Sequence, residues 1–101
     1  MKNAVFYCST RLKEGASVQD FLVAAEKLNN EYISKQKGYI SWKQLVDGEV
    51  RADFITFETM EDAKNFVENS CNAGELAERF YSFVELDSCT EHLFLIEKNY
   101  K

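Results

Sequence analysis

The sequence predicts an α+β domain in which the elements follow the order strand, helix, strand, strand, helix, strand. The strands are predicted where apolar and polar residues alternate with a period of two. The helices are predicted where apolar residues repeat at three- and four-residue spacing. The order is that of the split βαβ, or ferredoxin-like βαββαβ, fold. Right-handed crossovers then place both helices on one face of a four-stranded antiparallel sheet. At 101 residues, we expect one domain over 1–101.

The first two elements are a strand over residues 4–13 and a helix that begins at Ser17. Ser17 and Asp20 have the spacing of a capping box, with Asp in place of Glu. Gly38 is a natural C-terminal cap for this helix. The helix has one broad apolar stripe, formed by Val18, Phe21, Leu22, Ala25, Leu28 and Tyr32.

A hairpin is expected over residues 39–57, with the dipeptide Asp47-Gly48 as its tight turn. This turn would pair Trp42 with Asp53. Because side chains alternate across a sheet, each strand contributes to two faces. One face carries Ile40, Trp42, Val46, Ile55 and Phe57, and the other carries Tyr39, Leu45, Val50 and Phe54. Both faces are apolar, so both require a cover.

The second half begins with a helix at Thr59, again with an acidic residue three positions later, at Asp62. The segment 69–74 interrupts this helix, and a short helix over 75–83 follows. The last strand is expected over 89–97. Because both helices cover the same sheet face, we expect the other face to pack against a second copy in a two-fold homodimer.

Composition and charge exclude several classes of protein. A net charge of −5 with scattered Lys and Arg argues against nucleic-acid binding. No run approaches the roughly 18 to 20 apolar residues that span a bilayer, so no membrane association is expected. The three cysteines, Cys8, Cys71 and Cys89, form no CxxC pair, which predicts reduced thiols and a cytoplasmic location. Cys8 and Cys89 would lie close if the first and last strands are neighbours, which could permit a disulfide, or they could remain free as small apolar residues. With one histidine and no cysteine cluster, no metal site is expected.

Several segments together resemble the antibiotic biosynthesis monooxygenase-like family of dimeric α/β barrels, over roughly residues 5–97. These segments are the helix start at 17–21, the entry to the second strand at Lys37-Gly38-Tyr39-Ile40-Ser41, and the strand-to-helix passage at 53–59 followed by Glu61-Asp62-Ala63. The third strand often ends with a tryptophan in that family, and Phe57 stands there in this sequence.

The resemblance implies a homodimer with a barrel-like interface between sheets and, in each subunit, a pocket between sheet and helices. Members include oxygenases that act without metal or flavin on phenolic, anthrone-like or quinol substrates. Haem-degrading members resemble each other in an Asn on the first strand and a Trp and a His along the second helical region. Here only Asn3 lies at the fringe of that strand, and residues 60–83 contain neither Trp nor His, so haem degradation is disfavoured.

Five residues are candidates for the site. His92, the only histidine, could act as a general base or hydrogen-bond donor, or it could simply pack within the sheet. Trp42 and Asp53 could wall the pocket and orient a planar phenolic ligand. Alternatively, Trp42 is a core residue, with Asp53 bonded to its N–H or paired with a charge such as Arg51. Tyr7 and Tyr81 could donate hydrogen bonds to a substrate oxygen.

The sequence leaves two main functions open. The first is a cofactor-independent monooxygenase-like protein acting on a small aromatic or quinol metabolite. The second is a non-catalytic small-molecule-binding or scaffold homodimer of the same fold. An enzyme should have a closed apolar pocket on which His92, a tyrosine or Asp53 converges. A scaffold should have no cavity above roughly 300 Å³. A third possibility is docking of another protein along an open sheet edge.

Overall fold

The computed structural model describes residues 2–101, and its elements follow the predicted order. The four strands are β1 (Ala4–Arg11), β2 (Tyr39–Asp47), β3 (Val50–Phe57) and β4 (Thr90–Leu95). The three α-helices are α1 (Val18–Glu31), α2 (Met60–Glu68) and α3 (Glu75–Tyr81). Three short 3-10 turns lie between them: η1 (Ile33–Lys35), η2 (Ser70–Ala73) and η3 (Leu86–Ser88). The predicted fold class is confirmed.

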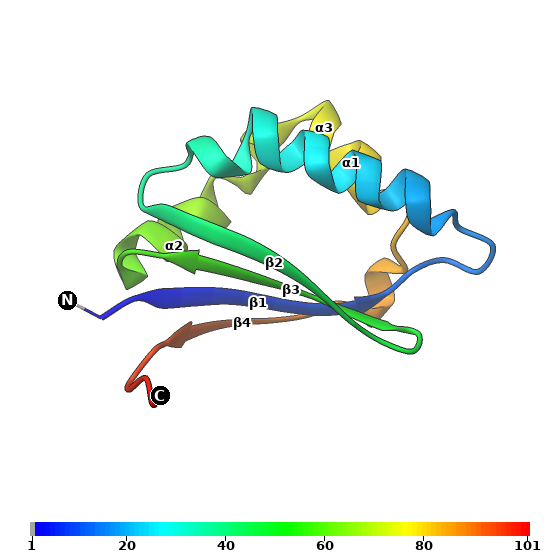
Figure 1. The fold of residues 1–101 in the computed structure, drawn as a ribbon. Coiled ribbons are helices and arrows are strands. Elements are labelled where there is room, and N and C mark those ends of the chain that lie inside the picture. The colour runs from blue at the N-terminus through cyan, green and yellow to red at the C-terminus, as the bar shows by residue number, and fades with distance from the viewer. Residues whose placement is uncertain (1) are drawn as a thin grey trace.

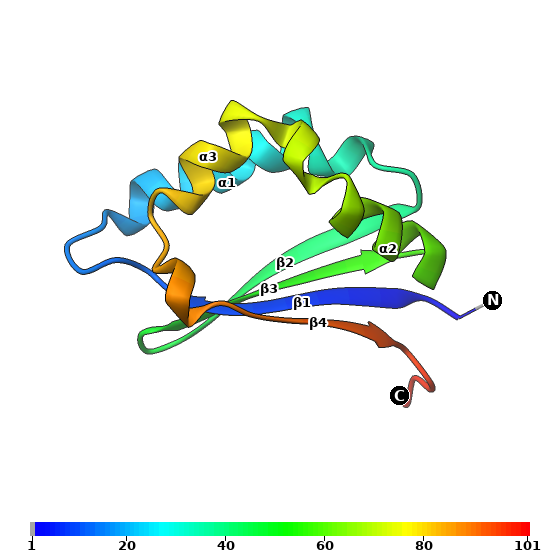
Figure 2. The ribbon, with the colours of Figure 1, turned by 180° about the vertical axis from the view of Figure 1, so that it is seen from behind.

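The strands form one antiparallel sheet in the order β2-β3-β1-β4. Figure 1 shows the helices together on one side of this sheet, with α1 and α3 side by side. Seen from behind in Figure 2, the same side carries the helices, and no helix of residues 2–101 covers the opposite face. The two faces of the sheet therefore have different surroundings.

Both predicted helix starts are present. The Ser17 hydroxyl accepts a hydrogen bond from the backbone N–H of Asp20 at 3.2 Å, and the Thr59 hydroxyl accepts one from the N–H of Asp62 at 3.1 Å. Each bond satisfies one of the backbone donors that a helix start leaves unpaired. Both helices therefore begin at the capping residues that the sequence predicts.

The end of α1 differs from the prediction. The helix stops at Glu31, and η1 then turns Ile33 into the core, where it is buried. Gly38 caps no helix but leads into β2 with a φ of +80°. A Cβ added at Gly38 would collide with the side chain of Asp62, so this position requires glycine for space as well as for conformation.

The hairpin forms where expected, but its register is shifted by two residues. Asp47 pairs with Val50, so the turn residues are Gly48 and Glu49, and Trp42 lies opposite Ile55 rather than Asp53. Only Gly48 has a positive φ, of 59°. This is the pattern of a type II′ turn, which needs glycine at its first central position, whereas an Asp47-Gly48 turn of type I′ would also require a positive φ at Asp47.

A β-bulge in β2 also changes the predicted faces. Tyr39 pairs with Phe57 and Ser41 with Thr56, so Ile40 is an extra residue between them. Tyr39 consequently shares the face of Phe57 and packs against the core, while Ile40 is 46% exposed. The sequence had assigned these two residues to the opposite faces.

The core lies between the sheet and the helices and is rich in aromatic rings. Phe21 of α1 lies 5.0 Å from Phe80 of α3, and Trp42 of β2 contacts Phe80 edge-on at 5.8 Å, measured between ring centroids. Beneath α2, Phe66 lies 5.1 Å from Phe57. The first and last strands are shorter than predicted: β1 ends at residue 11 and β4 at residue 95. No helix within residues 2–101 is long and apolar enough to cross a bilayer.

Candidate functional site

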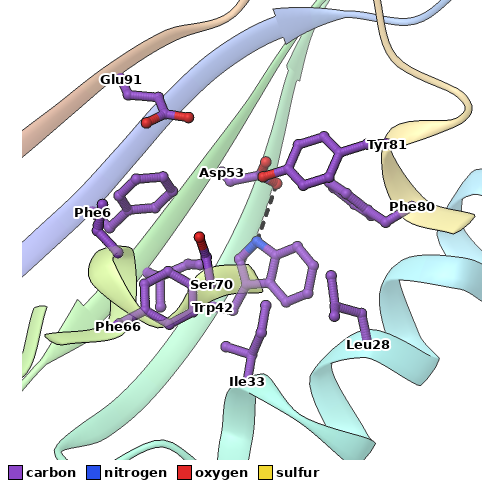
Figure 3. Close-up of a pocket in the computed structure, with 12 residues that line it drawn as sticks. Phe6, Leu28, Ile33, Trp42, Asp53, Phe66, Ser70, Phe80, Tyr81 and Glu91 are labelled. Atoms are coloured by element: carbon purple, nitrogen blue, oxygen red, sulfur yellow. Dashed lines mark hydrogen bonds between the residues drawn. The ribbon is translucent and has the colours of Figure 1, made fainter. Parts of the chain in front are cut away.

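A cavity of about 70 Å³ lies between the sheet and the helices. Its floor comes from the sheet strands, and its roof comes from α1, η1, α2, η2 and α3 (Figure 3). The lining is mostly apolar, and its polar groups are Asp53, Trp42 Nε1, Ser70, Tyr81 and Glu91. A small number of polar groups around an apolar cavity is the usual composition of a small-molecule site.

Asp53 is the most unusual residue in this cavity. It lies on β3 with 9% of its surface exposed, and its Oδ1 accepts a hydrogen bond from Trp42 Nε1 at 3.1 Å (Figure 3). Burial raises the pKa of Asp53 from 3.8 to about 6, and the bond from Trp42 opposes the shift. A carboxyl group with such a pKa is mainly ionised at pH 7 and remains basic enough to take up a proton.

Tyr81, the last residue of α3, extends over the cavity with its hydroxyl end on the side of Asp53 (Figure 3). Burial is the main factor that raises the pKa of Tyr81 above its ordinary value of 10, and the neighbouring acidic groups Cys8, Asp53 and Glu91 add to it. One edge of the residue remains open, with 37% of its surface exposed. Tyr81 therefore stays protonated near neutral pH and can donate a hydrogen bond into the cavity.

Three of the five predicted site residues meet at this cavity. Trp42, Asp53 and Tyr81 line it together. The contact between Trp42 and Asp53 persists despite the change in register, because a shift of two residues keeps each side chain on its own face. The indole of Trp42 packs on Phe80 in the core, and its N–H bonds Asp53 beside the cavity. A role of the pair in orienting a ligand stays a prediction.

The other two predicted residues lie on the opposite face of the sheet. His92 pairs with Tyr7 across β4 and β1. Its ring stacks on Phe94 at a centroid distance of 5.3 Å, and Tyr7 lies 6.3 Å from the same ring. His92 and Tyr7 are therefore not part of the cavity that contains Asp53. The catalytic role predicted for His92 stays a prediction.

Sequence reasoning missed two polar residues of the cavity, Ser70 and Glu91. Ser70 lies in η2, within the segment read only as an interruption of the second helix. Glu91 could have been found, because it alternates with Leu93 and Leu95 and so lies on the side of β4 that faces the helices. A carboxylate on the otherwise apolar side of a strand is the signal that would have indicated it.

The cysteines Cys8 and Cys89 are neighbours, as expected for adjacent first and last strands, and both are free. Burial, followed by the charge of Asp53, raises the pKa of the Cys8 thiol to about 12. The Cys89 thiol donates to Thr10 Oγ1 at 3.5 Å. Within residues 2–101, no group of three or more His, Cys, Asp or Glu side chains is arranged to hold a metal ion.

A comparison with solved structures identifies the fold. SnoaB, a cofactor-independent oxygenase from Streptomyces nogalater, matches with a TM-score of 0.78 and 8% sequence identity over 98% of this chain and 97% of its own. The fold is that of the antibiotic biosynthesis monooxygenase-like proteins. A Bacillus cereus protein provisionally assigned as an antibiotic biosynthesis monooxygenase matches with a TM-score of 0.65 and 18% identity, over 100% of this chain and 99% of its own.

The same fold carries other chemistry as well. A hydroxynitrile lyase from Passiflora edulis matches with a TM-score of 0.68 and 19% identity, over 99% of this chain and 98% of its own. A scan against protein-family models finds no match, and a search of curated proteins finds none either. At these identities, the comparisons establish the fold, and the reaction has to be argued from the residues of the site.

Proposed function

We propose that this protein is a cofactor-independent oxygenase that acts on a small aromatic or quinol metabolite, with Asp53 as the general base. The proposal depends mainly on one observation: a carboxyl group with a pKa of about 6 is buried in an aromatic-walled cavity. The fold shared with a cofactor-independent oxygenase supports the same reaction class. Catalytic bases work best when their pKa lies near the working pH, and Asp53 meets that requirement.

In the proposed reaction, Asp53 accepts the proton of a quinol hydroxyl. The resulting anion is electron-rich and transfers electrons directly to dioxygen. One oxygen atom replaces a ring hydrogen to give a hydroxyquinone, and the other takes up two protons, as many as the quinol loses, and leaves as water. The quinol supplies all four electrons that dioxygen accepts, so the reaction is balanced without an external reductant.

The neighbouring residues have distinct roles in this proposal. Tyr81 donates a hydrogen bond to the substrate oxygen as negative charge develops on it. Trp42 orients the Asp53 carboxylate through its N–H and offers an aromatic wall for the substrate ring. The phenyl rings of Phe6 and Phe66 complete the apolar lining.

The size of the cavity limits the substrate. An apolar cavity of about 150 Å³ can bind benzene, and this cavity has about 70 Å³. It must widen to admit one aromatic ring, and fused rings are disfavoured. Tyr81 is suited to move outward because part of it is already exposed. We therefore propose a single-ring quinol rather than an anthrone-like substrate.

The small volume of the cavity also favours a second candidate function, that of a non-catalytic binding or scaffold homodimer. The cavity lies well below the roughly 300 Å³ of ordinary ligand pockets, and Asp53 already has a protein partner in Trp42. A further alternative within the enzyme hypothesis is that His92 acts as the base, in a site on the other face of the sheet.

We also propose that two copies pair through the uncovered sheet face. Leu45 and Val50 are each 44% exposed on this face, and Phe94 is 51% exposed. Large apolar side chains exposed on one face of a sheet favour a partner that covers them. Light scattering should give twice the 11.7 kDa mass of one chain, and a stable 11.7 kDa species would refute the pairing.

The decisive experiment is oxygen uptake by the purified protein with a panel of hydroquinones, from one ring to three. Uptake with single-ring quinols and formation of a hydroxyquinone would support the oxygenase. Absence of uptake, together with a change in Trp42 fluorescence on ligand addition, would support the binding protein. Absence of both would support the scaffold.

A further inference from the structure

Two carboxylates and the thiol between them lie in one row across the sheet, beneath Tyr81. Asp53 of β3 pairs with Cys8 of β1, and Cys8 pairs with Glu91 of β4. Paired residues point to the same face, which here is the face toward the helices. Adjacent strands lie about 4.8 Å apart, so the backbones of Asp53 and Glu91 are separated by roughly 10 Å.

The two carboxylates of this row differ in their access to solvent. Asp53 is buried, whereas Glu91 is exposed, yet both line the same cavity. In Figure 3, Glu91 lies across the cavity from Trp42, with its carboxylate directed toward the side of Asp53 and Tyr81. Glu91 is therefore a group that reaches both the interior of the cavity and the solvent.

We propose that Glu91 transfers protons between the cavity and the solvent for the buried carboxylate Asp53. The inference depends on the proposed function, because the base must release the proton of one substrate before it accepts the next. In this role, Glu91 carries the proton of Asp53 to solvent and returns a proton from solvent to the oxygen that leaves as water. It returns to its starting state each time, so the transfer consumes no proton.

The other groups around Asp53 are less suited to this task. The Cys8 thiol lies between the two carboxylates, but its pKa is raised to about 12, so it seldom releases its proton near neutral pH. The pKa of Tyr81 is raised as well. Arg51, on the same strand as Asp53, lies over the Phe21 ring at 5.8 Å from its centroid. Cys89 bonds to Thr10.

Water can bridge the gap between the two carboxylates. A cavity needs roughly 10 to 15 Å³ per water molecule and two to four polar partners. The 70 Å³ cavity has this room, and Asp53, Ser70, Tyr81 and Glu91 provide the polar atoms. The substrate-free cavity therefore has room for a short chain of water molecules between Asp53 and Glu91.

The inference can be tested without a substrate, because Trp42 is the only tryptophan of the chain and bonds directly to Asp53. Protonation of Asp53 removes the charge beside the indole and should change its fluorescence. A fluorescence titration gives the pKa of Asp53, and D53N, which should abolish the titration, verifies the assignment. A laser-induced pH jump with a caged proton then gives the rate of protonation.

We expect E91Q to slow this relaxation about tenfold while leaving the equilibrium pKa of Asp53 unchanged. The matched control is E97Q, because Glu97 is exposed beyond the end of β4 and does not line the cavity. It should relax at the wild-type rate. An unchanged rate in E91Q would overturn the inference. So would a shift in pKa that accounts for the whole change in rate, because Glu91 would then act only through its charge.

Turnover provides an independent measurement. Once a quinol substrate is found, E91Q should reduce kcat about tenfold, and formate or imidazole in the buffer should restore most of the loss. Failure of these small acids and bases to restore activity would contradict a role in proton transfer. If the wild-type protein takes up no oxygen with any quinol, the proposed function fails, and the pH jump still decides whether Glu91 serves Asp53.

Discussion

Each face of the sheet carries side chains whose polarity does not match the surroundings of that face. The face covered by helices contains a buried carboxylate, Asp53, where an apolar residue would be expected. The uncovered face carries Leu45, Val50 and Phe94, where polar residues would be expected. Buried polar groups and exposed apolar patches are the informative departures from ordinary burial. They support the proposed site on the first face and the proposed pairing through the second.

Among substitutions that test the difference between the two faces, the largest loss of activity is expected from Asp53→Asn on the covered face. Asn keeps the shape of Asp and can still accept the bond from Trp42, but it cannot take up a proton. General base catalysis contributes roughly 10²- to 10⁴-fold to rate, so oxygen uptake with the best quinol should fall by that factor. Asp47→Asn, at the exposed end of β2, is the matched control. Full activity in D53N would remove Asp53 from the mechanism.

The next effect is on the uncovered face, where Leu45→Glu should prevent pairing of the chains. Burial of a leucine side chain contributes about 1.5 to 3 kcal/mol, and two-fold symmetry applies each substitution twice. Dissociation should therefore rise by roughly 10²-fold or more, measured by analytical ultracentrifugation. Leu86→Glu, which places the same charge at an exposed position of η3, outside the strands of the sheet, should leave the mass unchanged. Equal dimerisation of both variants would argue against this interface.

The covered face should also make stability depend on pH. The pKa of Asp53 is raised from 3.8 to about 6 in the folded chain. The unfolded chain therefore loses this proton first as the pH rises, which favours unfolding between pH 4 and pH 6. The loss corresponds to about 3 kcal/mol. Urea denaturation at fixed protein concentration should detect it in the wild type and find it missing in D53N, and equal slopes would contradict the buried carboxylate.

A smaller effect is expected from Trp42→Phe, which removes the hydrogen bond but keeps an aromatic ring. That bond lowers the pKa of Asp53, so without it the pKa should move further up. The acidic limb of the pH–rate profile should shift in the same direction. Phe80→Leu removes the aromatic contact with Trp42 and leaves the N–H in place, so its limb should not move. If the acidic limb of the pH–rate profile does not move in W42F, the hydrogen bond does not set the pKa of Asp53.

The smallest effect is expected from His92→Gln on the uncovered face. His92 stacks on Phe94, on the opposite side of the sheet from the cavity. Oxygen uptake should stay within about twofold of the wild type, with dimer mass as the control. A loss as large as that expected for D53N would move the reaction to the uncovered face and restore the base role predicted for His92.

Much of the fold follows from local patterns in the sequence. Alternation of side chains located the strands, and the hydroxyls of Ser17 and Thr59 marked the helix starts. The hairpin register was wrong by two residues because the conformational freedom of Gly48 serves either of two turn types. The bulge at Ile40 was not predictable, because an extra residue leaves no mark on a short apolar run.

The sequence predicted only those parts of the site in which the alternation of side chains along the hairpin determines which residues share a face. Trp42 and Asp53 share a face in either register, so their contact was foreseen. Tyr81 reaches the cavity through the packing of α3 on α1, which depends on tertiary contacts. His92 was favoured for its chemistry, although its neighbours Leu93 and Glu91 mark the other side of β4 as the one that faces the helices.

The bulge in β2 has a consequence for changes in chain length. Tyr39 lies opposite Phe57 and Ser41 opposite Thr56, so removal of Ile40 would leave a regular ladder in which both keep their partners. A deletion there should be tolerated, although it falls inside a strand. Loss of Lys43, only three positions further on, would turn every side chain on one side of the gap to the wrong face. Natural length variants of this chain should therefore accumulate at one position of β2 and avoid the rest.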